Sequence, residues 1–306
     1  MSRHTRIIRG LQGRANKWIN RPREIAGIYQ IDESRYLASN REYRDPDVFP
    51  LFQTELQGFK QKLIDSHESR IPLTLYKFGD GDYNFLKQVP VGSAQPGKRA
   101  LSLDYGQIDM SKFIDGSRKC DLYVCEILNQ NRKLFTEVFE GKAPDYPAEF
   151  LYGLLANRWL LKNLGSKIGL IGANSKISIV KRLIEHPQYQ DYLGISEFTD
   201  FISIPQKFAC DNVEEVSESV RRQLEISTSE VFLVGVGHVK SGLLHRLPNF
   251  RSAIYLDVGS GIDALAGIVD PYRPYFADWK NFRLRDPELY DSVDYLQYSG
   301  GNEVYI

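Results

Sequence analysis

Leu73-Thr-Leu-Tyr-Lys-Phe78 runs directly into Gly79-Asp-Gly-Asp82, so an apolar segment is followed by two carboxylates spaced by glycine. The first six residues are β-prone and predict a buried strand. The glycines permit a tight turn and let the backbone approach a ligand closely. Because open α/β sheets bind ligands outside the carboxyl ends of their strands, we expect Asp80 and Asp82 to lie at a binding edge.

After residue 70, short apolar runs alternate with segments of helical spacing. The apolar runs predict strands at residues 73–78, 122–126, 168–171, 201–204, 231–236 and 253–258. The helical spacing predicts helices at residues 51–67, 82–87, 132–139, 150–163, 177–185, 213–226 and 242–247. This alternation predicts an α/β fold, in which helices cover both faces of a mainly parallel sheet. We expect a single domain over residues 55–306.

Residues 1–54 are expected to form a basic helical extension and an irregular connector. The first 23 residues carry seven Arg or Lys residues and no acidic residue. Their apolar residues recur at helical spacing: Ile7, Ile8, Leu11, Ala15, Trp18 and Ile19. A cationic amphipathic helix of this kind could make peripheral contact with an anionic membrane. Two alternatives stay open, namely a helix packed on its own domain and a partly disordered basic tail.

The composition is that of a soluble globular protein, with 42% hydrophobic residues, 25% charged residues and a formal net charge of zero. This balance does not favour a nucleic-acid partner. No apolar stretch approaches the roughly 18 residues that span a bilayer, and we expect no signal peptide. The three cysteines, Cys120, Cys125 and Cys210, fit no zinc or redox spacing, which favours a reducing, cytoplasmic location.

Asp80 and Asp82 admit two interpretations. Two carboxylates one residue apart suit Mn²⁺ or Mg²⁺, with the remaining ligands supplied by water and a diphosphate. A metal in this position would stabilise a diphosphate leaving group electrostatically. Alternatively, Asp82 is only the N-cap of a helix that begins at Tyr83, and Asp80 is a turn residue. The spacing alone favours neither.

Three further strand ends follow the same plan. They lead into Gly172-Ala-Asn-Ser-Lys176, Gly237-His-Val-Lys-Ser-Gly242 and Val258-Gly-Ser-Gly-Ile-Asp263. Because free N–H groups at helix starts bind phosphate, adjacent turns of this kind predict a nucleotide site. The candidate nucleotide-binding residues are Gly79, Asp80, Gly172, Asn174, Ser175, Gly237, His238, Lys240, Asp257 and Gly259.

Each of these turns also has a purely structural interpretation. Glycine-rich strand–helix turns make tight connections in any α/β fold. Asn174 and Ser175 would then be helix caps, Asp257 a strand-end hydrogen-bond acceptor and Lys240 a solvated surface charge.

At Lys77-Phe-Gly-Asp-Gly-Asp82 the chain resembles the GT-D-type glycosyltransferases. That bacterial family has an Arg-Phe-Gly-Asp-Gly-Glu-like segment after an early strand. The C-terminal third is similar as well, in Val234-Gly-Val-Gly-His238 and in Leu256-Asp-Val-Gly259 followed by Asp263. The likeness covers roughly residues 55–285 in the order of elements. Lys77 stands where Arg is common, and Asp82 is one methylene shorter than the family's Glu.

The resemblance implies a Rossmann-like fold and transfer of a sugar from a nucleotide donor, UDP-linked, to a glycan or lipid-linked acceptor in surface polysaccharide or glycoprotein synthesis. It implies that Asp80 and Asp82 organise Mn²⁺ or Mg²⁺ on the sugar diphosphate, with Gly79 allowing a close approach. It also implies that the turns at residues 172–175 and 237–240 flank the nucleotide. Asp263 is then the candidate general base for the acceptor hydroxyl.

Two other functions compete with this interpretation. Leu256-Asp-Val-Gly-Ser-Gly261 looks like the first glycine motif of S-adenosylmethionine-dependent methyltransferases. That motif normally opens its domain, whereas here only 45 residues follow Gly261, and Asp263 replaces the third glycine. The second competitor is a non-catalytic module that binds a nucleotide or a glycan.

Overall fold

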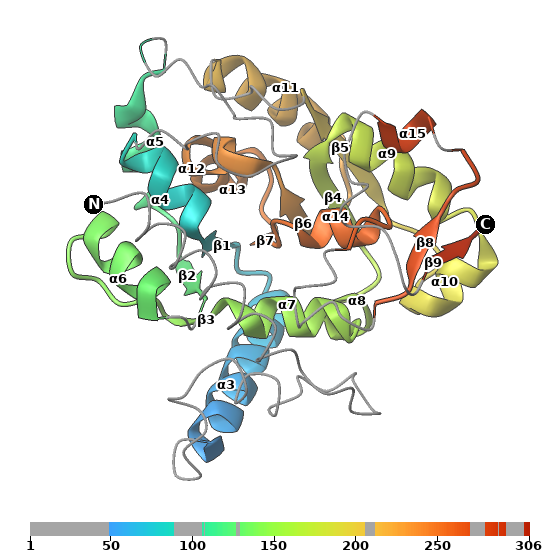
Figure 1. Ribbon diagram of the computed structural model, residues 1–306, viewed down its shortest axis with the longest axis horizontal. Helices are drawn as coiled ribbons and strands as arrows, with labels where there is room; N and C mark the ends of the chain where they lie inside the picture. Colours follow the sequence, from blue (N-terminus) through green and yellow to red (C-terminus); the bar gives the residue numbers. More distant parts are fainter. Residues whose placement is uncertain are drawn as a thin grey trace, which may run out of the picture.

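The computed structural model describes residues 49–88, 106, 108–126, 129–205, 212–269, 279–286, 288–291 and 303–306. Seven strands in these residues form one parallel sheet in the order β3-β2-β1-β7-β6-β4-β5 (Figure 1). The strands are β1 (Leu73–Phe78), β2 (Leu122–Cys125), β3 (Tyr146–Pro147), β4 (Ile168–Ala173), β5 (Asp200–Ile204), β6 (Val231–Gly235) and β7 (Ile254–Asp257). The predicted α/β fold is therefore confirmed, and the arrangement is consistent with a Rossmann-like fold.

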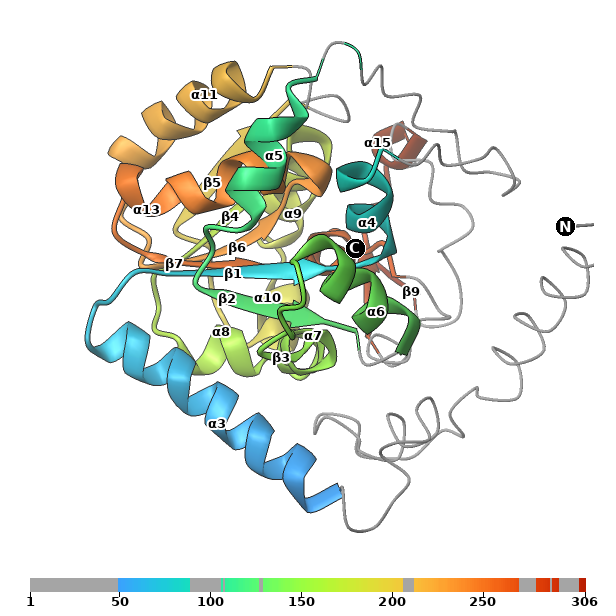
Figure 2. The same ribbon diagram turned by 90° about the vertical axis from the view of Figure 1, so that its left-hand side faces the viewer.

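Helices cover both faces of the sheet, and each face has its own hydrophobic cluster. One cluster includes residues of α4 (Asp80–Leu86), α5 (Met110–Ser117), α6 (Asn129–Val138), α11 (Val213–Glu225) and α12 (Lys240–Leu243). The other includes residues of α3 (Phe49–Glu68), α7 (Ala148–Ala156), α8 (Trp159–Asn163), α9 (Asn174–Leu183), α10 (Pro187–Leu193) and α14 (Gly261–Leu265). Figure 2 shows α5 and α11 on one side of the sheet and α3 and α8 on the other. The central strands β1, β4, β6 and β7 are mainly apolar because helices cover both faces of the sheet.

At the centre of the sheet, adjacent strands send the chain to opposite faces. β1 leads into α4 and β6 leads to α12 on one face, whereas β7, which lies between them, leads into α14 on the other. Crossovers between parallel strands are right-handed, so the direction in which the chain moves along the sheet decides which face it crosses. Such reversals mark the crevice where α/β sheets bind ligands.

Alternation along the strands decides which face each side chain meets. In β1, Leu73 and Leu75 join the cluster that contains α7, and Tyr76 joins the cluster that contains α4. Lys77 therefore reaches the α7 face. The same alternation turns Asp257, the last residue of β7, towards α12.

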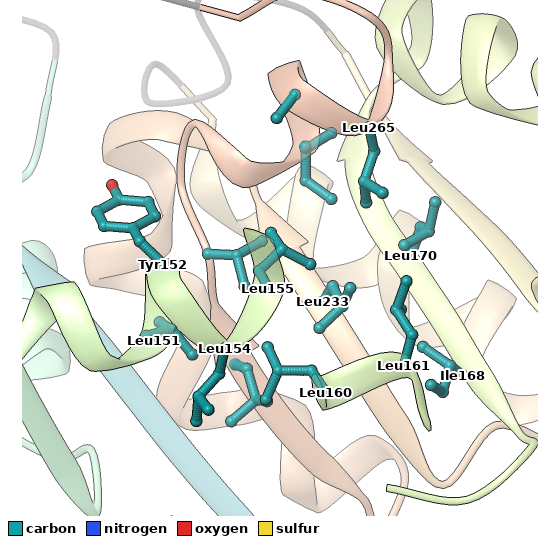
Figure 3. Packing of buried hydrophobic residues seen from close by; sticks show 14 of the residues in the cluster. Leu151, Tyr152, Leu154, Leu155, Leu160, Leu161, Ile168, Leu170, Leu233 and Leu265 are labelled. Atoms are coloured by element: carbon teal, nitrogen blue, oxygen red, sulfur yellow. The ribbon is translucent and has the colours of Figure 1, made fainter. Parts of the chain in front are cut away.

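The core between the sheet and the helices α7 and α8 is apolar (Figure 3). Its labelled members include Leu151, Leu154, Leu155, Leu160, Leu161, Ile168, Leu170 and Leu233. The prediction of one helix over residues 150–163 is wrong, because the chain breaks between α7 and α8 at Arg158, whose φ of 63° is left-handed. Asn157 Oδ1 accepts the Trp159 N–H at 2.9 Å and so helps to start the second helix.

Several elements differ from the predicted ones. The helix predicted at residues 242–247 lies within a run of four short helices, namely η3 (Gly237–Val239), α12, η4 (Leu244–Arg246) and α13 (Leu247–Phe250). Periodicity did not reveal α5 or the two-residue strand β3. It also missed α15 (Glu288–Asp291) and a second parallel sheet of β8 (Asn281–Arg283) and β9 (Glu303–Tyr305).

Some predictions fall partly or wholly outside the described residues. The amphipathic helix at residues 1–23 and Cys210 lie outside them, whereas Cys120 and Cys125 are buried free thiols. The boundary expected between residues 54 and 55 falls inside α3, which begins at Phe49. Among the helices the structure describes, none has the length and apolar character needed to cross a membrane.

Candidate functional site

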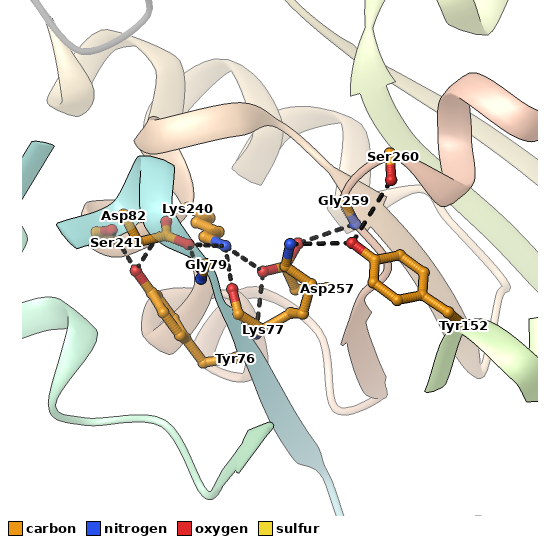
Figure 4. A network of polar contacts seen from close by, with 10 residues as sticks. All are labelled: Tyr76, Lys77, Gly79, Asp82, Tyr152, Lys240, Ser241, Asp257, Gly259 and Ser260. Carbon is orange, nitrogen blue, oxygen red and sulfur yellow. Dashed lines mark hydrogen bonds and ion pairs between the residues drawn. The ribbon is translucent and has the colours of Figure 1, made fainter. Parts of the chain in front are cut away.

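Charged residues from three neighbouring strand ends meet at the carboxyl edge of the sheet (Figure 4). Lys77 lies near the end of β1, Asp82 in the helix after it, Lys240 at the start of α12, and Asp257 at the end of β7. The side chains of Asp82, Lys240 and Asp257 are only 7%, 5% and 1% exposed. The fold therefore gathers buried opposite charges at the edge where a ligand is expected.

One of the contacts that fix the Asp82 side chain lies within the first turn of its own helix. α4 begins at Asp80 with Gly79 as its N-cap, and Asp82 Oδ2 accepts the Gly79 N–H at 2.8 Å. The alternative interpretation, in which Asp82 is the N-cap of a helix beginning at Tyr83, is therefore wrong. Asp82 caps from the third helical position instead, as in a capping box, and its charge faces the positive end of the helix.

Lys240 is a buried ion, and the interpretation as a solvated surface charge is wrong. Its Nζ lies 2.7 Å from Asp257 Oδ2 and 3.1 Å from Asp82 Oδ2, and it donates to the carbonyl oxygen of Lys77. Three oxygen acceptors thus match the three N–H donors of the ammonium. Nζ also lies 4.6 Å from the centre of the Tyr76 ring. A buried charge persists in a protein when it is compensated in this way.

Asp257 joins β7 to its neighbours. Its Oδ2 accepts the backbone N–H of Lys77 at 3.1 Å as well as the ammonium of Lys240. Its Oδ1 accepts the Gly259 N–H at 3.2 Å. The interpretation of Asp257 as a strand-end hydrogen-bond acceptor is therefore confirmed.

Tyr76 and Ser241 form further hydrogen bonds around Asp82 on the α12 face of the sheet. The Tyr76 hydroxyl lies 2.7 Å from Ser241 Oγ and donates to Asp82 Oδ1 at 3.3 Å. Burial, reinforced by the charge of Asp82, raises the pKa of Tyr76 well above its ordinary value. The phenol therefore stays protonated and remains a donor to the carboxylate.

Asp82 and Lys77 each hold their charge near neutral pH. Burial alone would raise the pKa of Asp82, but the ammonium groups of Lys240 and Lys77 outweigh it and hold the pKa below its ordinary value. Burial alone would lower the pKa of Lys77, but Tyr152 and the carboxylates of Glu126 and Asp82 raise it above its ordinary value. The aspartate is therefore an anion and the lysine a cation at neutral pH.

Lys77 presents its ammonium on the opposite face of the sheet from Lys240. Its Nζ donates to the Tyr152 hydroxyl of α7 at 2.9 Å. Two glycines lie beside it, because a Cβ built on Gly79 would be 3.4 Å from Nζ and one on Gly259 would be 3.7 Å away. The half-buried ammonium thus stands next to two stretches of backbone that carry no side chain, which is an arrangement an anionic ligand can approach.

Asp263, the predicted general base, lies in the first turn of α14 and forms an ion pair with Lys176 of α9. Both side chains are 18% exposed. The interpretation of Asn174 and Ser175 as N-caps is wrong, because the N-cap of α9 is Ala173. Asn174 is exposed, whereas Ser175 Oγ is buried and has no hydrogen-bond partner in the described part of the chain.

The remaining predicted residues lie at the same edge in different settings. Gly172 is buried, and a Cβ there would lie 3.1 Å from Ile177, so this glycine serves packing. Gly237 has a left-handed φ of 62°, and a Cβ there would meet no described atom within 4 Å. The His238 ring stacks on Phe85 with a centroid distance of 4.9 Å and an interplanar angle of 7°.

The described groups do not fit a metal bound through Asp82. All four carboxylate oxygens of Asp82 and Asp257 accept hydrogen bonds, and the Lys240 ammonium lies between the two carboxylates. A divalent cation in the same place would be repelled by that ammonium. Among the residues that the structure describes, no group of three or more His, Cys, Asp or Glu side chains could hold a metal. The side chain of Asp80 lies outside the described atoms, so metal binding through Asp80 stays a prediction.

Tyr76, Ser241 and Tyr152 were not among the predicted site residues. Strand alternation could have revealed Tyr76, because it lies on the opposite face of β1 from Lys77 and so faces the helix that follows. Ser241 follows Lys240 directly in the predicted turn. No signal in the sequence pointed to Tyr152, which comes from a helix that is leucine-rich and almost wholly buried.

No protein-family model matches this chain, and no curated protein and no solved structure matches it significantly.

Proposed function

We propose that this chain is a glycosyltransferase that moves a sugar from a nucleoside diphosphate, UDP in the first instance, to a glycan or lipid-linked acceptor. The observation that carries the proposal is the setting of the Lys77–Asp82 segment, which holds the resemblance to the GT-D-type family. Its lysine and second aspartate are joined to Asp257 and Lys240 at three adjacent strand ends. Nucleotides bind at such reversal points in α/β sheets.

The role of Lys77 follows from the chemistry of the donor. When the bond between the anomeric carbon and the diphosphate oxygen breaks, negative charge develops on the leaving diphosphate. The Lys77 ammonium, fixed by Tyr152 and flanked by Gly79 and Gly259, would stabilise that charge. The N–H of Gly259 is already taken by Asp257, so Gly259 contributes a close backbone approach.

Asp263 is the group proposed to accept the proton of the acceptor hydroxyl. The acceptor oxygen then forms the new bond to the anomeric carbon as the diphosphate leaves. The ion pair with Lys176 would orient the Asp263 carboxylate on α14. Both residues lie beyond strands that end at the same edge as Lys77.

Two further parts of the proposal depend on residues or side chains outside the described ones. Mn²⁺ or Mg²⁺ would be held through Asp80, and it would supply further neutralisation of the diphosphate. Residues 1–23 would bring the enzyme to the membrane surface on which a lipid-linked acceptor is presented. A cytoplasmic location at that surface agrees with the free, buried thiols of Cys120 and Cys125.

A donor-hydrolysis screen tests the proposed function. The full chain is incubated with a panel of nucleotide sugars, with and without Mn²⁺, and the release of free nucleoside diphosphate is measured. We expect the wild-type chain to release UDP from at least one UDP-sugar. We expect Asp263→Asn to lose this release only in assays in which the release requires an acceptor. Binding without release would favour the non-catalytic module. Binding of S-adenosylmethionine in place of any nucleotide sugar would favour the methyltransferase.

A further inference from the structure

The cation that neutralises Asp82 is part of the polypeptide. Lys240 Nζ lies within 3.1 Å of both Asp82 and Asp257, and it donates to the Lys77 carbonyl oxygen as well. Two carboxylates and one backbone carbonyl are hard oxygen donors of the kind that bind Mg²⁺ or Mn²⁺. Here the same oxygens surround an ammonium.

We propose that the Lys240 ammonium fills the cation position between Asp82 and Asp257, so that the donor site of this chain is built without a divalent metal on Asp82. The inference deepens the proposed function and rests on it only for the identity of the donor. It concerns how the turn after β1 is held against β7, and therefore how Lys77 and Gly79 are positioned.

Three observations carry the inference. The ammonium is saturated, since each of its three N–H groups has an oxygen acceptor. The other oxygen of each carboxylate has a donor within the protein as well, since Asp82 Oδ1 accepts the Tyr76 hydroxyl and Asp257 Oδ1 accepts the Gly259 N–H. All three charged side chains are more than nine-tenths buried, so water does not compete for them.

The two aspartates of the motif thus have different roles. Asp82 belongs to the buried charge cluster that it forms with Lys240 and Asp257, where it is a positioning residue for the turn after β1. Metal binding, if it contributes, then depends on Asp80 alone. Replacing Asp82 should leave the affinity for a metal ion unchanged, and replacing Lys240 should create an additional metal site, between Asp82 and Asp257, that the wild-type chain does not have.

Titration of the full chain with Mn²⁺ alone, followed by electron paramagnetic resonance and by thermal unfolding, tests this inference. The variants are Asp82→Asn, which keeps the hydrogen-bond acceptor, and Lys240→Met, which keeps the length of the stem. Lys167→Met is the matched control, because Lys167 pairs with Glu230 at 3.1 Å but is 53% exposed.

We expect Asp82→Asn to bind Mn²⁺ as the wild type does, within twofold. Lys240→Met should gain Mn²⁺-dependent stability, with the melting temperature rising by about 5–10 °C at roughly 100 times the dissociation constant. Wild type and Lys167→Met should show no such gain.

A tenfold or greater loss of Mn²⁺ affinity in Asp82→Asn would overturn the inference, and so would a folded Lys240→Met that gains nothing from Mn²⁺. If Lys240→Met does not fold even with Mn²⁺, the comparison of Asp82→Asn with the wild type decides the question. These outcomes are independent of turnover. Failure of donor hydrolysis would overturn the proposed function but would leave the charge cluster of Asp82, Lys240 and Asp257 unaffected. Binding of Mn²⁺ to Asp82 would overturn only the inference.

Discussion

The ammonium of Lys240 lies 2.7 Å from the carboxylate of Asp257, and the two side chains are 5% and 1% exposed. This pair ties the helical turn after β6 to the end of β7, the strand beside it. Through Asp82 it also ties both to the helix after β1. The carboxyl edge of the sheet is therefore held together by ions inside the protein, and the positions of Lys77 and Gly79 depend on them.

Removing the charge of Lys240 should destabilise the fold strongly. Lys240→Met leaves two buried carboxylates without their cation, and breaking a buried pair typically costs about 3–5 kcal/mol. Urea unfolding at neutral pH without divalent metals measures the change. The exposed pair of Lys167 and Glu230 is the control, because Lys167→Met should cost only about 0–1 kcal/mol. Equal losses in the two variants would contradict the role given to the buried ions.

Lys77→Met should lower donor turnover by about 10²–10³-fold, the typical effect of removing one group that stabilises transition-state charge. Lys77→Arg should retain part of the activity, since it keeps a cation at the strand end. Initial rates of nucleoside diphosphate release, with circular dichroism to check folding, give the result. Lys142→Met is a matched control, because Lys142 also lies over a tyrosine ring, that of Tyr123, which is near the start of β2 and not at its carboxyl end. A Lys77→Met variant with full turnover would show that this ammonium does not meet the diphosphate.

Stability should fall between pH 6.5 and pH 4 because of His245. Burial, together with the positive charges of Arg246 and Lys119, lowers the pKa of His245 to about 4 from 6.5. The unfolded chain therefore binds a proton on His245 over this range and the folded chain does not, so unfolding is favoured as the pH falls. His245 packs against Gly116 of α5, next to the backbone of Ser241.

Urea unfolding at several pH values, on the wild type and on His245→Gln, isolates this contribution. The difference between the two free energies of unfolding should change between pH 6.5 and pH 4 and should be constant above that range. An identical pH dependence in both proteins would rule the assignment out. Proton NMR of the imidazole gives an independent measurement of its pKa.

Two glycine substitutions should have opposite effects. A Cβ on Gly235 would lie 2.5 Å from Ile262 Cγ1 and 2.8 Å from the carbonyl oxygen of Gly259, so Gly235→Ala should cost roughly 1–3 kcal/mol by overpacking. Gly58 lies inside α3 and is exposed, and a Cβ there meets no described atom within 4 Å. Gly58→Ala should therefore stabilise the protein by roughly 0.5–1 kcal/mol. Thermal unfolding of both variants checks the signs, and a neutral Gly235→Ala would contradict the packing of α14 on β6.

The basic arm should bind anionic membranes. Residues 1–23 carry a net positive charge from seven Arg or Lys residues and alternate apolar residues at helical spacing. In the full chain, replacing Arg6, Arg9, Arg14 and Lys17 together by Gln should abolish sedimentation with vesicles that contain phosphatidylserine, because attraction is worth about 1 kcal/mol per basic residue near such a surface. Vesicles of neutral lipid are the control. Equal sedimentation of both chains would show that the arm serves another purpose.

Local sequence patterns were sufficient where neighbouring residues decide the structure. The mainly apolar runs at β1 and β7 predicted buried strands, because strands covered on both faces are largely hydrophobic. The same logic failed for β3, whose two residues carry no period, and for the break at Arg158, where the left-handed backbone interrupts a continuous apolar pattern. The helix after β1 was expected, although its start was placed two residues too late.

The sequence by itself determined the α/β alternation, the parallel sheet and the presence of Asp82 at a strand end, because periodicity and turn chemistry act over a few residues. Only the tertiary structure decided what Asp82 does. Its ionic partner, Lys240, is 158 residues away in the chain. Whether a lysine in a turn meets solvent, a phosphate or a buried carboxylate depends on which strands lie side by side, and here β6 and β7 deliver Lys240 and Asp257 to the end of β1. Burial then makes the pairing obligatory, because neither charge could be left in the interior alone.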